Sequence, residues 1–176
     1  MHNTETPTTE TNAHRLAVLG LGGTIAMTAL QDSGAVPGLA AEDLIEALPN
    51  TAAQRVGHVE NVRRLPGAHL ELSDLVELAK RIRTLESEEE ITGVVVVQGT
   101  DTIEETVFAL DILLGGKLPV VVTGAMRHAG QVSSDGAANL AGALYTAAAP
   151  EARGQGALVC FNDEIHAAWC VQKSAA

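Results

Sequence analysis

Aromatic residues are scarce in this chain of 176 residues, in which one Trp, one Tyr and two Phe make up 2% of the composition. Hydrophobic residues nevertheless make up 46%, so the core must be built from Ala, Val, Leu and Ile. Such a core suits layered packing of helices on a sheet better than an aromatic-rich β-sandwich. A chain of this length can bury one sizeable core and is short for two. We therefore expect one α/β domain.

Basic residues are also few, since 11 Lys and Arg stand against 22 Asp and Glu, for a formal net charge of -11. This charge opposes binding to nucleic acid and to anionic membranes. No apolar run approaches the roughly 20 residues of a membrane-spanning helix, and the polar N-terminus carries no apolar signal region. The sequence therefore predicts a soluble, cytoplasmic protein that binds neither nucleic acid nor membrane.

Signatures of metal, disulfide and nucleotide binding are missing as well. The two cysteines, Cys160 and Cys170, and six scattered histidines form neither a disulfide framework nor a metal-ligand pattern. Gly20, Gly22 and Gly23 do not complete the dinucleotide fingerprint G-x-G-x-x-G, because residue 25 is Ile. Neither the P-loop pattern nor the G-x-S-x-G elbow of the α/β-hydrolases occurs. We expect no metal and no organic cofactor.

What the chain does contain is an alternation of apolar runs with helical patterns. Residues 1–14 are polar and predict a flexible tail, and residues 15–176 predict the domain. The run Gly93–Gln98 holds four consecutive valines, which indicates a central parallel strand buried on both faces. Other strands are predicted at Arg15–Leu19, Val56–Val62, Leu118–Thr123 and Ala157–Phe161, and helices at Leu39–Leu48, from an N-cap at Ser73 to about Leu85, from Thr102 to Leu114 and at about Asp135–Ala149. This order predicts an open, mostly parallel, three-layer sheet with helices on both faces, Rossmann-like or flavodoxin-like.

Three local patterns add detail to these helices. Thr102 and Glu105 fit a capping box. Glu77 and Arg81 have the spacing of an ion pair on one helix. The acidic cluster Glu86–Glu90 disfavours a helix C-terminus, so we expect the chain to turn there.

Polar side chains follow the predicted strands at their carboxyl ends, where open parallel sheets bind ligands. They are Thr24 after the first strand, Thr100 and Asp101 after the valine strand, Arg127 after the next, and Asn162 and Asp163 after the last. Together they offer hydroxyls, carboxylates and a guanidinium to one small ligand. Gly-Thr turns are also common where a strand passes into a helix, so Asp101 could equally be a helix cap.

A threonine nucleophile needs a base, because its hydroxyl is undissociated near neutral pH. A lysine that is desolvated against the sheet and held by Asp101 could lose its proton and serve as that base. The chain has three lysines. Lys80 is on an exposed helix face and Lys117 is in a predicted turn, which leaves Lys173.

These motifs resemble, in order and spacing, those of the bacterial-type L-asparaginases. The matching motifs are Gly22-Gly23-Thr24-Ile25-Ala26, Gly99-Thr100-Asp101-Thr102-Ile103-Glu104-Glu105-Thr106, Gly124-Ala125-Met126-Arg127, Ser134-Asp135-Gly136, Asn139-Leu140, Asn162-Asp163 and Val171-Gln172-Lys173-Ser174. The resemblance runs from Leu16 to Ser174. It implies hydrolysis of L-asparagine to L-aspartate and ammonia without metal or organic cofactor, with weak glutaminase activity as a secondary expectation.

The resemblance also implies roles for individual residues. Thr24 resembles the nucleophile that forms the acyl-enzyme, and Thr100, Asp101 and Lys173 resemble the second catalytic group. Asp101 would bind the α-amino group of the substrate, and the Thr100 backbone N–H would help to hold the oxyanion. The implied substrate-binding residues are Gly23, Gly67, Ala68, Gly99, Thr100, Asp101 and Ala125.

The sequence departs from the family in several places. The family usually has a lid tyrosine after the first threonine, whereas Gln31–Pro37 contains none and the only tyrosine, Tyr145, is in a predicted helix. The serine that contacts the substrate carboxylate is replaced by Gly67. Trp169 stands where Arg is common, and His128 where Pro is common.

Typical members also carry a C-terminal domain that completes the active site of a neighbouring subunit. The sequence resembles the short single-domain members, or an isolated N-terminal domain, and we expect a homo-oligomer, dimer or tetramer. One alternative is a catalytically impaired amino-acid-binding domain. Another is the amidase partner of a tRNA-dependent amidotransferase, which the acidic charge and the missing extra domains oppose.

Overall fold

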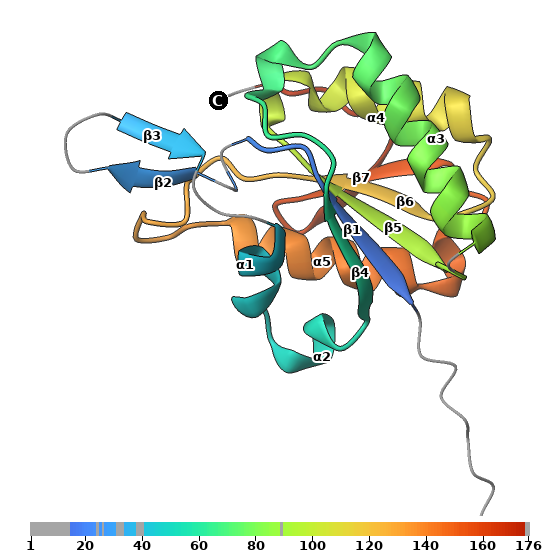
Figure 1. Cartoon of the computed structure of the whole chain (residues 1–176), viewed down its shortest axis with the longest axis horizontal. Helices are drawn as coiled ribbons and strands as arrows, with labels where there is room; N and C mark the ends of the chain where they lie inside the picture. Colours follow the sequence, from blue (N-terminus) through green and yellow to red (C-terminus); the bar gives the residue numbers. More distant parts are fainter. Residues whose placement is uncertain are drawn as a thin grey trace, which may run out of the picture.

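A computed structural model describes residues 15–23, 25, 27–30, 34–37, 41–88 and 90–174 (Figure 1). One open six-stranded sheet has the order β4-β1-β5-β6-β7-β8. Its strands are β1 (Leu16–Gly20), β4 (Val56–Asn61), β5 (Gly93–Val97), β6 (Val120–Thr123), β7 (Ala157–Phe161) and β8 (Glu164–Ala167). The first five in this order are parallel, and β8 pairs antiparallel to β7.

Helices cover both faces of this sheet, as Figure 1 shows. The helices α1 (Ala41–Glu46), α2 (Asn50–Ala53) and α5 (Gly136–Ala148) pack on one face, and α3 (Leu72–Glu88) and α4 (Ile103–Leu114) on the other. The valines of β5 alternate between the two layers: Val95 and Val97 face α5, while Val94 and Val96 face α3 and α4. All four are at most 1% exposed. The predicted three-layer fold is therefore confirmed.

The strand order explains where a ligand site can form. Taken along the chain, the five parallel strands have the order 2-1-3-4-5 of the flavodoxin-like folds. In such sheets ligands bind outside the carboxyl ends of the strands, where the strand order reverses. Here that point lies between β1 and β5, which pair directly from Leu16↔Gly93 to Gly20↔Val97.

Shorter elements connect these layers. A separate two-stranded antiparallel sheet consists of β2 (Met27–Leu30) and β3 (Gly34–Pro37). Single turns of 3₁₀ helix form η2 (Gly67–His69), η3 (Thr100–Thr102) and η4 (Pro150–Ala152). No helix among the described residues is long and apolar enough to cross a membrane. The predicted tail, residues 1–14, lies outside the described residues.

The structure corrects the predicted ends of α3. The helix begins at Leu72, so Ser73 is inside it rather than its N-cap. Asp74, in the first turn, makes the capping hydrogen bond: its carboxylate accepts the Glu71 N–H at 3.0 Å. The helix also continues to Glu88 through the acidic cluster, since the fully buried Leu85 anchors its last turns in the core.

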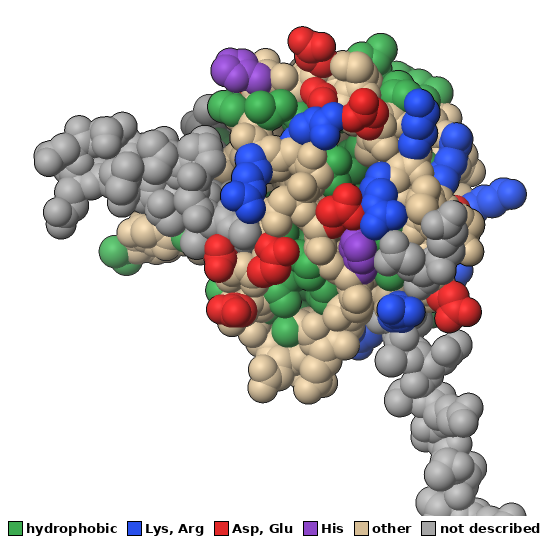
Figure 2. Space-filling model, in the orientation of Figure 1, with side chains coloured by type: hydrophobic (Ala, Val, Ile, Leu, Met, Phe, Trp, Pro, Cys, Tyr) green, Lys and Arg blue, Asp and Glu red, His purple; other side chains and the backbone are tan. Residues whose placement is uncertain are grey.

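The predicted pair between Glu77 and Arg81 is wrong. Glu77 pairs with Arg63, and Arg81 donates to Glu60 of β4 at 2.7 Å. Both side chains therefore tie α3 to β4 and to the segment that follows it. In Figure 2 acidic and basic side chains are interspersed over the face that carries this helix.

The turn at Asn162-Asp163 also differs from the prediction, because the chain reverses there into β8. Phe161 pairs with Glu164, and both turn residues have positive φ, 52° and 63°. Two such residues form the type I′ turn typical of hairpins, for which Asn and Asp are favoured. The polar pair therefore forms a hairpin turn, from which the return strand carries the chain towards Lys173, and Asn162 also lines the cavity beside Thr100 as the sequence predicts.

Candidate active site

The site forms where three glycines bring separate loops into backbone contact. Gly23 follows β1, Gly67 opens η2, and Gly99 precedes η3. A Cβ on Gly23 would overlap the Gly99 backbone and lie 2.6 Å from the Gln98 carbonyl carbon. A Cβ on Gly67 would lie 3.1 Å from the Gly99 carbonyl oxygen. Only a residue without a side chain allows this approach at position 23, whereas a Cβ on Gly99 would be a tight contact at 3.0 Å from the Gly67 nitrogen. The packing brings the backbones of Gly23, Gly67 and Gly99 together.

Backbone hydrogen bonds hold the segment that carries Gly67. The N–H groups of Val62 and Arg63 donate to the Gly20 carbonyl at 2.9 and 3.1 Å. The Leu65 N–H donates to the Leu21 carbonyl at 3.0 Å. The chain leaving β4 therefore continues along the loop that leaves β1, and Gly67 arrives beside Gly99.

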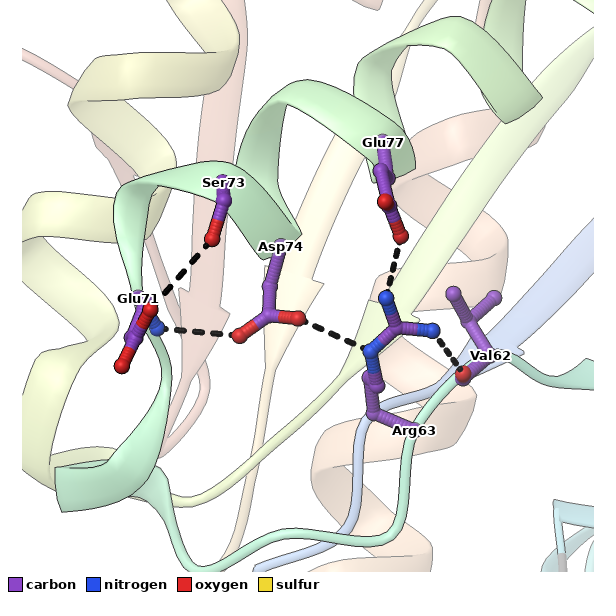
Figure 3. A network of polar contacts seen from close by, with 6 residues as sticks. All are labelled: Val62, Arg63, Glu71, Ser73, Asp74 and Glu77. Carbon is purple, nitrogen blue, oxygen red and sulfur yellow. Dashed lines mark hydrogen bonds and ion pairs between the residues drawn. The ribbon is translucent and has the colours of Figure 1, made fainter.

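Arg63 fixes the same segment to α3, as Figure 3 shows. Its guanidinium donates to Asp74 at 2.8 Å, to Glu77, and to the Val62 carbonyl at 3.0 Å. The Glu71 N–H, followed by this guanidinium, holds the pKa of Asp74 below its ordinary value. One arginine thus connects the end of β4 to the first two turns of α3.

The valine strand delivers Thr100 and Asp101 to this point, and Lys173 reaches them from the other end of the chain. The Lys173 ammonium donates to the Thr100 hydroxyl over 2.9 Å between Nζ and Oγ1. Its Nζ lies 3.6 Å from Asp101 Oδ1. Thr100 is buried, the Lys173 side chain is 23% exposed, and the Asp101 carboxylate is 60% exposed. Lys173 therefore bridges a buried hydroxyl and a solvent-facing carboxylate.

Contacts with α4 hold Lys173 in place. Its backbone N–H donates to Glu104 Oε1 in the first turn of α4 at 2.5 Å. Val171 packs against the core layer of α3 and α4. The Ala168 N–H donates to the Ala157 carbonyl at the start of β7 at 3.2 Å. The segment after β8 therefore lies back along α4, which brings Lys173 to Thr100.

The loop after β6 forms the other wall of the site. The Thr100 hydroxyl donates to Met126 Sδ at 3.6 Å. A Cβ on Gly124 would lie 3.3 Å from Thr100 Cγ2. Arg127 donates to the Ser133 carbonyl at 3.3 Å and so braces this loop.

A cavity of about 690 Å³ adjoins the Thr100–Lys173 pair. Its lining includes Met126 and Arg127 of the β6 loop and His166 of β8. Pockets for small ligands have volumes of about 300–1,000 Å³. The volume therefore suits a small molecule, and hydroxyl, ammonium and guanidinium groups meet there.

The structure brings most of the predicted site residues together. Thr100, Asp101 and Lys173 are in direct contact, and the backbones of Gly23, Gly67 and Gly99 pack on one another. Ala68 is exposed beside Gly67, and Ala125 is buried with its side chain in the α5 core layer. Thr24, the predicted nucleophile, lies outside the described residues.

Sequence reasoning assigned Thr102 wrongly and missed two contacts. The Thr102 hydroxyl makes no capping bond and donates instead to the Gly67 carbonyl at 3.0 Å. It therefore links η2 to η3 rather than closing a capping box with Glu105. The contacts of Glu104 and Met126 were not predicted, although both residues belong to the motifs that resemble the asparaginases, because these contacts depend on where distant segments meet.

The described part of the chain contains no group of three or more His, Cys, Asp or Glu side chains that could hold a metal ion.

Comparison with known proteins decides the family. The model of the N-terminal asparaginase domain ("Asparaginase, N-terminal") matches residues 15–176. The chain belongs to the asparaginase family. This asparaginase-family chain is 37% identical to L-asparaginase 2 of Bacillus subtilis over 165 residues, which cover 90% of the chain and 44% of that protein. It is 32% identical to the glutaminase-asparaginase of Pseudomonas fluorescens, and this match covers 94% of the chain and 47% of that protein.

A solved structure supports the same assignment. The probable cytoplasmic L-asparaginase of Campylobacter jejuni superposes with a TM-score of 0.84 at 34% identity. The match covers 92% of this chain and 50% of that one. The chain thus spans about half the length of the relatives it matches.

Proposed function

We propose that this chain is an amidohydrolase that converts L-asparagine to L-aspartate and ammonia without metal or organic cofactor. Relatives that carry the name L-asparaginase support the substrate class. The observation that carries the proposal is the contact of Lys173 Nζ with Thr100 Oγ1 at 2.9 Å and with Asp101 Oδ1 at 3.6 Å. A lysine held between a hydroxyl and a carboxylate can exchange a proton with that hydroxyl, which is what an alcohol nucleophile needs nearby.

In the proposed reaction the Thr24 hydroxyl attacks the side-chain amide carbon of asparagine. Its proton passes through the Thr100 hydroxyl to Lys173 in the neutral amine form, the resulting ammonium gives a proton to the leaving nitrogen, and the C–N bond breaks to release ammonia. The Thr100 backbone N–H would stabilise the oxyanion of the tetrahedral intermediate. Water then attacks the acyl-enzyme, the same pair takes its proton, and aspartate leaves with the Thr24 hydroxyl restored.

The carboxylate of Asp101 would bind the α-amino group of the substrate. Its 60% exposure leaves an oxygen free for that contact while the other faces Lys173. Once the α-amino group is fixed, the extra methylene of glutamine displaces its amide carbon from the nucleophile. Because misplacement of about 1 Å can cost about 100-fold in rate, we propose weak activity on glutamine. A relative from Pseudomonas fluorescens carries the name glutaminase-asparaginase, which supports assaying both amides.

Ammonia release from L-asparagine by the purified chain tests the proposal. Thr24→Ala removes the attacking hydroxyl and should lower turnover by several orders of magnitude, while Thr24→Ser should retain part of it. Thr84→Ala is the matched control. The bond described for the Thr84 hydroxyl is to the Lys80 carbonyl within α3, away from the site. A near-normal rate in Thr24→Ala would refute the nucleophile, and equal efficiency on glutamine would refute the specificity.

A second candidate function is an amino-acid-binding domain without catalysis. It is favoured by Gly67, which offers no side chain where the family has a serine. Calorimetric binding of aspartate, together with no detectable ammonia release, would select this candidate over the hydrolase.

We also propose a cytoplasmic homo-oligomer, dimer or tetramer. Phe108, Tyr145 and Trp169 are 50%, 43% and 77% exposed, although the chain has few aromatic residues. Aromatic residues are enriched in protein interfaces. Light scattering after gel filtration should give a multiple of 18.2 kDa, and a mass of one chain would contradict the proposal.

A further inference from the structure

The motif Ser134-Asp135-Gly136 with Asn139 takes no part in the proposed reaction. We propose that Asp135 and Asn139 are positioning residues that set the geometry of the Thr100–Lys173 pair from the start of α5. The catalytic consequence rests on the proposed function, whereas the effect on Lys173 itself does not.

Asp135 acts through the loop after β6. Its two carboxylate oxygens accept the backbone N–H groups of Arg127 at 2.9 Å and Met126 at 3.0 Å. Met126 in turn accepts the Thr100 hydroxyl at Sδ. The carboxylate therefore fixes the backbone of the residue whose sulfur accepts the Thr100 hydroxyl.

Asn139 acts on two loops at once. It is 4% exposed, and its amide nitrogen donates to the Gly124 carbonyl at 3.0 Å and to Asp135 at 3.1 Å. Its amide oxygen accepts the Asn162 N–H at 3.0 Å. Gly124 lies against Thr100, and Asn162 opens the hairpin turn from which β8 leads to Lys173. One buried amide thus joins the loop beside Thr100 to the hairpin that leads to Lys173.

The simpler interpretation is that Asp135 only caps α5. A capping aspartate accepts an N–H from the first turn of its own helix. Asp135 is at the N-cap position of α5 and makes no such side-chain bond. Both of its oxygens are instead bonded to the neighbouring loop, which is the arrangement expected of a positioning residue.

The three lysines allow a direct test, because ¹⁵N-lysine labelling gives three side-chain signals and Lys173→Arg assigns that of Lys173. We expect Asp135→Asn and Asn139→Ala to shift the Lys173 signal and to leave those of Lys80 and Lys117 unchanged. In ammonia-release assays both variants should lower kcat about 10- to 100-fold with KM for asparagine changed less than about threefold, because the substrate contacts remain.

Asp111→Asn is the matched control, since Asp111 also accepts a backbone N–H, that of Ala157 at 2.8 Å, but at the start of β7 and so at the end of the sheet opposite to Thr100. This variant should leave the Lys173 signal unshifted and kcat within about twofold of that of the parent chain. If the chain releases no ammonia, the proposed function fails and the lysine spectra alone judge the positioning role. An unshifted Lys173 signal in both folded variants would overturn it. So would circular dichroism showing that both variants unfold while Asp111→Asn folds, because the role would then be in stability alone.

Discussion

Gly23→Ala should destabilise the fold far more than the same substitution at Gly154. Gly23 has φ +88° and Gly154 has φ +76°, so both replacements put an alanine in a left-handed conformation. That conformation costs about 1–2 kcal/mol for an L-residue. A Cβ on Gly154 meets nothing within 4 Å, whereas a Cβ on Gly23 overlaps the Gly99 backbone. The difference between the two variants therefore measures the free-energy cost of the steric overlap alone.

The steric part can be estimated from the contacts. The Gln98 carbonyl carbon would be 2.6 Å from the new Cβ, so one of the two loops must move. Forced overpacking of this kind costs about 1–3 kcal/mol. We therefore expect Gly154→Ala to lose about 1–2 kcal/mol and Gly23→Ala about 2–5 kcal/mol.

Urea denaturation of both variants, with a common slope m, measures these losses in the free energy of unfolding. Gly23→Ala should also lose ammonia release, because the turn that carries Thr100 moves with Gly99, while Gly154→Ala should keep it. Equal destabilisation of the two variants would refute the close packing of Gly23 on the Gly99 backbone.

Two further predictions concern charges and thiols. Burial alone would raise the pKa of Glu60, but hydrogen bonds from Arg81 and His58 outweigh it and leave the pKa lowered. The Glu60 carboxylate thus contributes stability above its ordinary pKa of about 4.3, and this contribution is lost as the pH falls through the lower pKa of the folded state. In acid denaturation the free energy of unfolding of Glu60→Gln should therefore fall less steeply with decreasing pH than that of the parent chain. The same fall in both chains would contradict this. Burial raises the pKa of the Cys160 thiol, while Cys170 is exposed. Mass spectrometry after brief iodoacetamide treatment of the folded chain should therefore find Cys170 modified and Cys160 unmodified. Equal labelling of the two cysteines would contradict the burial of Cys160.

The parallel sheet could be predicted from the sequence because its strands are buried on both faces. Four consecutive valines at Val94–Val97 are compatible with few other structures, and every strand predicted from an apolar run is present. The short strand β8 was missed, since Glu164–Ala167 is an edge strand with mixed polarity. Its only local signal was the Asn-Asp turn before it.

The site could be predicted in part for a different reason. Lys173 was selected because the other two lysines were placed on a helix surface and in a turn, and the chain does bring it to Thr100. The bonds of Thr102, Glu104 and Asn139 could not be predicted, because each joins segments that only the fold places side by side.

A double-mutant cycle on Thr100→Val and Lys173→Met, read as kcat/KM for ammonia release from L-asparagine, tests the central claim most directly. Proton transfer by a positioned side chain contributes about 10²–10⁴-fold, so each single variant should lose about that much. Residues that act as one unit are strongly non-additive, so the double variant should lose little more than either single one. Losses that multiply, or single variants within about twofold of the parent chain, would contradict the claim that Thr100 and Lys173 work as a pair.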